Sequence, residues 1–206
     1  MSGISVNPRW ALLAVAVSLL ASANGLRAAT FFDDLSATNG GSETVGDTRW
    51  LAQEFKTDGS TYTGLSATLL MSQASAGVAQ LDLYSDAGIT PGSFIATFVS
   101  PGTFSTSSLA NATFTATGLS LAANTDYWLV LHAPTGSYNW GWTSDFTIMQ
   151  GWADTSNSGS VWFGDNAFPL QCSVSSFVVP EPMSIVLLAG GCVPLLFRRR
   201  IVFRNK

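Results

Sequence analysis

The sequence predicts an all-β domain, an antiparallel β-sandwich of the jelly-roll kind, over residues 30–179. Apolar and polar residues alternate with a period of two in many short runs. Clusters of Gly, Pro, Asn and Asp separate these runs at intervals of about 8–12 residues, which is typical of antiparallel sandwiches. Outside two apolar ends, no segment has the i, i+3, i+4, i+7 spacing of an amphipathic helix.

The strands are expected, in chain order, at 49–55, 65–72, 78–84, 93–99, 111–117, 126–132, 137–142, 160–164 and 173–179. In the run 65–72, four apolar side chains share one face: Leu65, Ala67, Leu69 and Met71. Turn residues punctuate the chain at Asp58-Gly59, Pro91-Gly92, Pro101-Gly102, Asn124-Thr125, Pro134-Thr135-Gly136 and Asn157-Ser158-Gly159.

The charge of this domain is strongly negative. Between residues 30 and 179 there are two basic residues, Arg49 and Lys56, and twelve acidic ones, which gives a formal charge of −10. Such a surface repels phosphate backbones, so we expect no nucleic-acid partner.

Residues 1–23 are typical of a secretory signal peptide. Arg9 precedes the apolar stretch 11–23, and Ala21-Ser22-Ala23 is a small-residue pattern that signal peptidase cleaves. Cleavage after Ala28 or Ala29 is the alternative. A permanent N-terminal anchor is less favoured, because the apolar stretch is shorter than the ~20 residues of a spanning helix.

A second apolar stretch, 183–197, is expected to form a short hydrophobic helix of roughly 22 Å, a marginal membrane span. The cluster Arg198, Arg199 and Arg200 follows it and should stay on the cytoplasmic side. Pro180, Glu181 and Pro182 would then lie just outside the bilayer, where two prolines keep the backbone extended and accessible.

Val179 precedes Pro180-Glu181-Pro182, and this order of Val-Pro-Glu-Pro, apolar stretch and arginine cluster resembles the PEP-CTERM sorting signal, which would occupy residues 180–203. The resemblance implies that an exosortase processes the chain near Pro180, Glu181 and Pro182, in bacteria that make exopolysaccharide and biofilm. The domain would then be transferred to another anchor or released. The same tail occurs on ice-binding proteins, but the single run 113–117 (TFTAT) does not repeat as an ice-binding face requires.

Residues 45–145 resemble the bacterial choice-of-anchor R domain. The likeness rests on strand order and on the strand Asp-Tyr-Trp-Leu-Val-Leu at 126–131. It implies an exported β-domain and no particular activity.

The sharpest feature of the domain is the alternation of Tyr138, Trp140 and Trp142, which places three rings on one face of a strand. Rings that face inward would anchor a core that has no disulfide to stabilise it, and we favour that interpretation. An exposed row of rings would instead stack on sugar faces, as in a carbohydrate-binding module. Trp152 and Trp162 follow in the same third of the chain.

Other candidate sites are weaker. We predict no catalytic residues: the single histidine, His132, ends a strand without a Gly-x-Ser-x-Gly motif nearby, and Glu43 and Glu54 lie in no hydrolase motif. One histidine and one domain cysteine do not make a zinc site, and Cys172 and Cys192 are not expected to pair. We expect no cofactor.

A bound calcium ion is an alternative that the composition leaves open. The loops 31–41 and 83–92 combine aspartates with Gly and Asn, as oxygen-ligand loops do, but ordinary turns have the same composition.

The sequence therefore predicts a non-catalytic structural or adhesive protein, exported and held briefly in the inner membrane with its C-terminus in the cytoplasm. It would then reside at the cell surface or in the extracellular matrix. The expected partners are signal peptidase, exosortase, the membrane during sorting and, as an alternative, exopolysaccharide. A carbohydrate-binding module is the competing function, and an extracellular hydrolase or an ice-binding protein is weaker.

Overall fold

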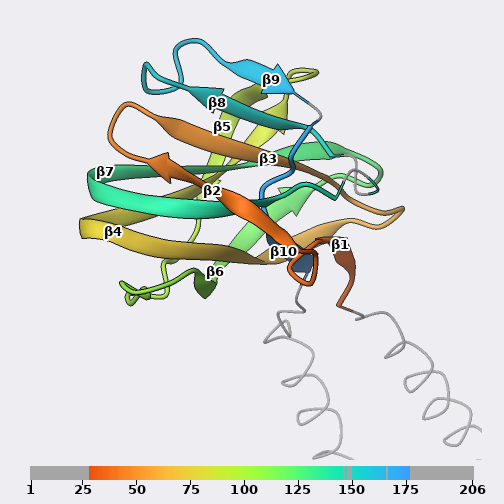
Figure 1. The fold of residues 1–206 in the computed structure, drawn as a ribbon. Helices are drawn as coiled ribbons and strands as arrows, with labels where there is room; N and C mark the ends of the chain where they lie inside the picture. The colour runs from red at the N-terminus through yellow and green to blue at the C-terminus, as the bar shows by residue number, and fades with distance from the viewer. Residues whose placement is uncertain (1–27, 146, 148–149, 166, 177–206) are drawn as a thin grey trace, which may run out of the picture.

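The computed structural model describes residues 28–145, 147, 150–165 and 167–176. Within these ranges every regular element is a β-strand (Figure 1). The strands are β1 (Thr30–Asp33), β2 (Asn39–Val45), β3 (Trp50–Lys56), β4 (Tyr62–Asp86), β5 (Pro91–Thr97), β6 (Ala110–Leu121), β7 (Asp126–Thr143), β8 (Trp152–Thr155), β9 (Phe163–Asp165) and β10 (Cys172–Ser176).

All pairs are antiparallel, and hydrogen bonds join the strands into one sheet that curls into a half-barrel (Figure 1). Its main path runs β1-β10-β4-β7-β3-β8-β9, while β2 pairs with β7, and β5 and β6 pair with β4. The all-β antiparallel prediction is confirmed.

Two long strands give the sheet its curl. β4 spans both predicted runs 65–72 and 78–84, and β7 spans both 126–132 and 137–142. The turn predicted at Pro134-Thr135-Gly136 was wrong, because these residues lie inside β7. The pairing of β4 with β7 shifts register there, and Gly77 and Gly136 pack backbone to backbone where no Cβ would fit. Glycine thus lets the two strands bend together without separating.

The main hydrophobic core lies on one face of the curl. The alternating residues Leu65, Ala67, Leu69 and Met71 are all buried in it, as the pattern predicted. A second, smaller cluster occupies the other face and consists of Ala52, Trp128, Val130 and Ala153. β7 is therefore buried on both faces, because Leu129 faces the first cluster while Trp128 and Val130 face the second.

Three strands lack a clear sequence signal. β1 and β8 are four residues each, and β2 (NGGSETV) is mostly polar and carries two glycines. They pair because longer strands offer them a hydrogen-bonding edge, which is a tertiary effect.

The two ends of the domain lie side by side. Thr30 in β1 pairs with Ser175 in β10, and the backbone N–H of Ala29 donates a 2.8 Å hydrogen bond to Oγ of Ser176. The chain therefore enters and leaves the domain at the same edge of the sheet (Figure 1).

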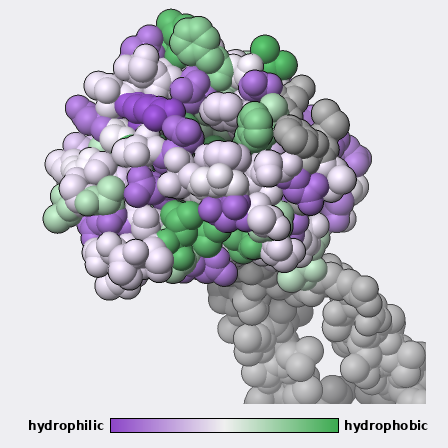
Figure 2. Space-filling model, in the orientation of Figure 1, coloured by the Kyte–Doolittle hydropathy of each residue, from purple (hydrophilic) through white to green (hydrophobic). Residues whose placement is uncertain are grey.

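The face shown in Figure 2 is mostly polar or weakly polar, with small separate hydrophobic groups. Large apolar side chains are exposed at Val78, Ile89, Phe94, Ile95, Val99, Val161, Phe163 and Phe168. No helix in the described ranges has the length and apolar character needed to cross a bilayer. The predicted apolar segments 11–23 and 183–197 lie outside those ranges.

Candidate functional site

The run Tyr138, Trp140 and Trp142 does not form an exposed row of rings. Tyr138 and Trp140 are 1% and 0% exposed and belong to the main core. Each also has its polar atom bonded: the Tyr138 hydroxyl donates to the carbonyl of Gly77 at 2.7 Å, and Nε1 of Trp140 donates to that of Gln171 at 3.0 Å. Sugar contact by these two rings is thereby overturned, because their faces are covered by protein.

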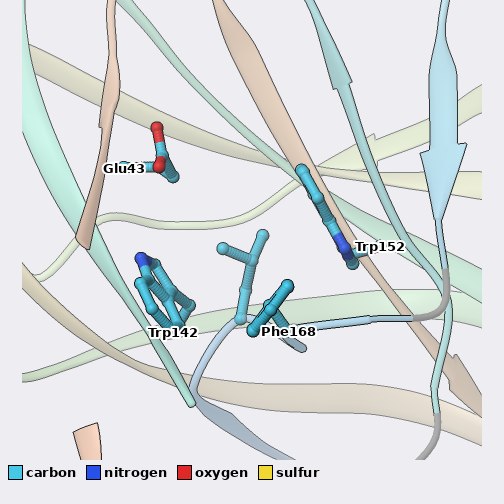
Figure 3. Close-up of a pocket in the computed structure, with 5 residues that line it drawn as sticks. Glu43, Trp142, Trp152 and Phe168 are labelled. Atoms are coloured by element: carbon cyan, nitrogen blue, oxygen red, sulfur yellow. The ribbon is translucent and has the colours of Figure 1, made fainter. Parts of the chain in front are cut away.

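Trp142, in contrast, is only partly buried and lines a cavity of about 150 Å³ (Figure 3). We call this cavity the aromatic pocket; its walls are Glu43, Trp142, Trp152, Phe168 and Leu170. Glu43 and Trp142 lie on one side in Figure 3, and Trp152 lies across from them. The residues come from β2, β7, β8 and the segment before β10, so only the folded sheet brings them together.

A glycine pair in β2 makes room for Trp142. In the pairing of β2 with β7, Gly41 is opposite Trp142, and the register shifts between Asn39 and Gly41. A Cβ at Gly40 would overlap the indole ring, and Gly41 has a φ of +155° and also lies against that ring. The indole therefore rests on bare backbone, which explains the Asn-Gly-Gly sequence of this strand.

Gln53 fixes two walls of the pocket. Its buried amide accepts a hydrogen bond from the N–H of Leu170 at 2.7 Å and donates to the carbonyl of Gly151 at 3.2 Å. Leu170 is thus held from one side and Trp152, the neighbour of Gly151, from the other. A buried, bonded amide of this kind holds its partners in one arrangement.

Phe168 lines the pocket with its backbone in an unusual conformation. Its φ is +59°, a left-handed conformation that a bulky side chain rarely adopts and that costs about 1–3 kcal/mol. The next residue is held in place, because the N–H of Thr143 donates to the carbonyl of Pro169 at 3.0 Å. The ring of Phe168 meets Trp142 edge to face, with 5.3 Å between centroids.

A carboxylate and a guanidinium lie beside the aromatic pocket. Oε2 of Glu43 is 2.7 Å from Nη2 of Arg49, and the same nitrogen is 3.9 Å from Oδ2 of Asp154. Both partners of the shorter pair are about 40% exposed, so the pair contributes at most about 1 kcal/mol to stability. Its polar atoms remain accessible to a ligand.

A second cavity, of about 450 Å³, lies where β4 and β7 bend. Gln73, Val78, Phe104 and Tyr138 are among its lining residues, and the Tyr138 hydroxyl already takes part in two hydrogen bonds. The first cavity contains one carboxylate and the second contains none. Neither offers the facing pair of acids that glycoside hydrolysis requires.

His132 is buried rather than placed at a surface site. Its Nε2 is 3.0 Å from Oδ2 of Asp82, and its ring stacks on Trp50 with 4.5 Å between centroids. The hydroxyl of Thr97 donates to the other oxygen of Asp82 at 2.6 Å, so its bond goes to the acid rather than to the histidine. His132 and Asp82 are thus buried polar groups with hydrogen-bond partners. They lie on the face of the sheet that carries Trp128 and Val130, which we call the outer face. The arrangement lacks the nucleophile–base contact of a triad.

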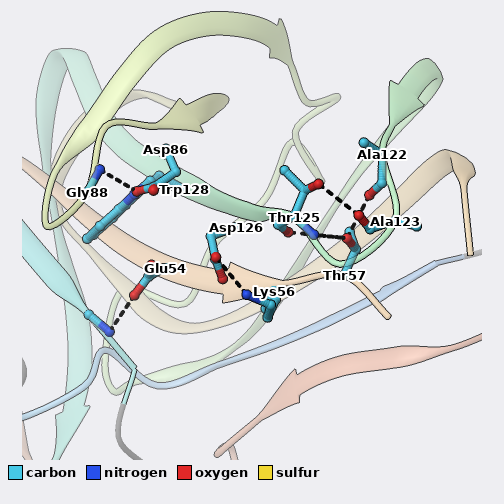
Figure 4. Close-up of polar contacts among 11 residues, drawn as sticks. Glu54, Lys56, Thr57, Asp86, Gly88, Ala122, Ala123, Thr125, Asp126 and Trp128 are labelled. Carbon is cyan, nitrogen blue, oxygen red and sulfur yellow. Dashed lines mark hydrogen bonds and ion pairs between the residues drawn. The ribbon is translucent and has the colours of Figure 1, made fainter. Parts of the chain in front are cut away.

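Acidic side chains gather at one edge of the outer face, and each has a protein partner (Figure 4). Asp86 accepts from Nε1 of Trp128 at 2.9 Å, Asp126 pairs with Lys56 at 2.8 Å, and Glu54 accepts from the N–H of Gly151 at 3.0 Å. Burial and the nearby acids raise the pKa of Glu54.

The two loops considered for calcium behave as turns. In 83–92, Asp86 accepts from the N–H of Gly88 at 3.0 Å, and in 31–41, Asp33 accepts from the N–H of Leu35 at 3.3 Å. Asp34 accepts from the N–H of Cys172 at 2.6 Å. In the part of the chain that the structure covers, no three His, Cys, Asp or Glu side chains are grouped so as to hold a metal ion.

Some predicted residues cannot be placed. The sorting motif Pro180, Glu181 and Pro182 and the cluster Arg198–Arg200 lie outside the described residues, as does Cys192. Cys172 is fully buried as a free thiol, and this burial raises its pKa well above the usual value.

Sequence reasoning singled out Trp142 but missed Phe168 and Leu170, which lie in a stretch without strand periodicity. Glu43 and Trp152 were noted without a role. Phe168-Pro169 carries no local signal for a site, because its place depends on contacts with β3 and β7.

No protein-family model matches the chain, and no curated protein is significantly similar to it.

Proposed function

We propose that this chain is an exported bacterial surface or extracellular-matrix protein that an exosortase sorts through residues 180–203. The proposal includes a jelly-roll-like sandwich as the fold of its β-domain. The role of this domain is structural or adhesive and non-catalytic. The observation that carries the proposal is the order of three parts along the chain: Pro180-Glu181-Pro182, the apolar stretch 183–197 and Arg198–Arg200. The chain would be held in the inner membrane only during sorting.

The geometry of the domain supports this route. Ala29 and Ser176 lie against each other, so the segments on either side of the domain join it at one edge. A domain attached in this way leaves its other surfaces free to contact matrix components while one end is still in the bilayer. The strongly acidic composition of residues 30–179 favours a soluble exterior over contact with anionic lipid.

Intact-mass measurement of the protein from its native host tests the proposal. We expect a mature form without residues 1–23 (or 1–28 or 1–29) and without the tail beyond Pro180-Glu181-Pro182. The variant Glu181→Ala, or a strain without exosortase, should keep the tail and stay in the membrane fraction. A full-length protein in the cytosol of the wild-type host would overturn the proposal.

A carbohydrate-binding module is the second candidate function, and the aromatic pocket is the observation that favours it. The ring row that first suggested sugar contact is not available, but Trp142 contributes to a different group of rings with Trp152 and Phe168.

A further inference from the structure

We propose that the aromatic pocket binds one neutral pyranose ring, such as the terminal sugar of a polysaccharide. This inference rests on the second candidate function and does not require the sorting route. It assigns the contact to Trp142, Trp152 and Phe168 in place of the Tyr138–Trp142 row.

The size of the pocket limits its ligand. An apolar protein cavity of about 150 Å³ holds one benzene molecule, so the aromatic pocket has room for one six-membered ring. Trp142 and Trp152 stand on opposite sides of it (Figure 3). By its volume the pocket takes a single ring, whereas a longer chain would have to continue outside. The pocket is therefore suited to a chain end.

The chemistry of the walls fits a sugar. A pyranose presents C–H faces, which pack on aromatic rings, and hydroxyls, which both donate and accept hydrogen bonds. The carboxylate of Glu43 accepts and the guanidinium of Arg49 donates, and their nearest atoms are 2.7 Å apart. One hydroxyl, or two adjacent ones, can use both groups, and sites of this kind combine apolar area with a few polar atoms.

Charge favours a neutral sugar over an anionic or a cationic ligand. An anionic sugar would be repelled by the domain as a whole, whose formal charge between residues 30 and 179 is −10. A cationic ligand would suit an aromatic pocket, but Glu43 is already neutralised by Arg49, whose positive charge would repel it. A neutral ring meets neither penalty.

Two energetically unfavourable features also lie at the aromatic pocket. Phe168 has a strained backbone, and Nε1 of Trp152 is buried without a hydrogen-bond partner. Such departures persist where surrounding structure enforces them, and they cluster at binding sites.

The test is a titration of the full chain, purified in a polyoxyethylene detergent because glucoside and maltoside detergents carry pyranose rings themselves. The probes are the methyl glycosides of glucose, galactose, mannose and N-acetylglucosamine, followed by tryptophan fluorescence and by saturation-transfer NMR. We expect at least one of them to bind with a Kd of about 1 mM, as suits a single small ring.

Variants locate the site. Trp142→Ala should weaken binding at least about tenfold, because it removes a ring face. Phe168→Gly should do the same while keeping the fold, since glycine adopts the positive φ without strain. Glu43→Gln should weaken binding less, because the amide oxygen still accepts. Phe94→Ala, an exposed ring outside the pocket, is the matched control and should bind normally.

Three outcomes would overturn the proposal. The first is no response to any neutral glycoside up to about 50 mM, well above the expected Kd. The second is binding that Trp142→Ala and Phe168→Gly leave unchanged. The third is a preference for choline or glucuronate over the neutral glycosides. The mass measurement of sorting is independent of all three, so failure of the pocket and failure of the sorting route can be told apart.

Discussion

Two buried side-chain atoms have no hydrogen-bond partner within the described ranges, Nε1 of Trp152 and Oδ2 of Asp34. A buried polar atom without a partner costs about 1–3 kcal/mol, so each lowers the stability of the domain. They lie in different places: Trp152 lines the aromatic pocket, whereas Asp34 follows β1 and contacts β10.

Replacing Trp152 should therefore cost little stability. Trp152→Phe removes a donor that has no acceptor, so we expect a loss of less than about 1 kcal/mol. Trp140→Phe is the matched variant: it removes the buried bond to the carbonyl of Gln171 and should cost more, about 1–3 kcal/mol. Urea denaturation of both variants gives the comparison, and equal losses would contradict it.

Asp34 should make stability depend on pH. Burial raises the pKa of its carboxyl from 3.8 to about 7, while the N–H of Cys172 opposes this by hydrogen bonding. The folded state then binds the proton more tightly than the unfolded state between pH 4 and 7. Stability should fall as pH rises through this window, by at most about 4 kcal/mol, and should level off above pH 7.

The variant Asp34→Asn isolates this effect, because the amide does not titrate. Its melting temperature, measured from pH 4 to pH 8, should lack the decline that the wild type shows between pH 4 and 7. Its amide oxygen can still accept from the N–H of Cys172. Parallel profiles for the two proteins would assign the pH dependence to another group.

At the scale of elements, the bend shared by β4 and β7 decides the shape of the sheet. Both strands are long enough to cross the whole domain, and each is irregular at the same level. Gly77 and Gly136 lie there in direct backbone contact. The curl of the sheet follows from this shared bend, since straight strands of such length would make a flat sheet with open edges.

A side chain at Gly77 should thus destabilise the fold. The Cβ of Gly77→Ala would meet the backbone of Thr135 and Gly136, which must move apart, and we expect a loss of about 1–3 kcal/mol. Gly46→Ala is the control, because nothing lies within 4 Å of the added Cβ. Chemical denaturation should show a lower free energy of unfolding for Gly77→Ala than for Gly46→Ala. Equal stabilities would mean that the backbones of β4 and β7 can move apart at the bend without cost.

At the scale of the whole molecule, the pairing of β1 with β10 holds the first and the last strand of the domain side by side. Thr30 and Ser175 are partners in this pairing. Paired Cα atoms in an antiparallel sheet are about 4.5–5.5 Å apart, which is within the range of a disulfide.

The double variant Thr30→Cys with Ser175→Cys, in a Cys192→Ser background, should therefore form a disulfide. Because it closes a loop of nearly the whole domain, it should stabilise the fold by about 2–4 kcal/mol. Mass analysis before and after reduction detects the bond, and urea denaturation measures its effect. Thr30→Cys with Ser173→Cys is the mismatched control and should stay reduced. A bond in neither variant would place the two ends apart.

The sequence by itself determined the all-β class, the buried faces and the place of most strands. These follow from alternation, since a period of two leaves one arrangement that hides Leu65, Ala67, Leu69 and Met71 together. It could not give the continuity of β4 and β7, because Pro134-Thr135-Gly136 has the composition of a turn and becomes strand only through contact with Gly77.

Only the tertiary structure decided which aromatic rings face outward. Tyr138, Trp140 and Trp142 share one pattern along the chain, but only the first two are fully buried. Phe104 packs on the ring of Tyr138 and the carbonyl of Gln171 accepts from Trp140, whereas Trp142 is left at a pocket. Exposure depends on what packs against a strand, and those neighbours are distant in sequence. For the same reason the walls contributed by Phe168 and Leu170 have no local signal: their positions come from Gln53 and from the end of β7.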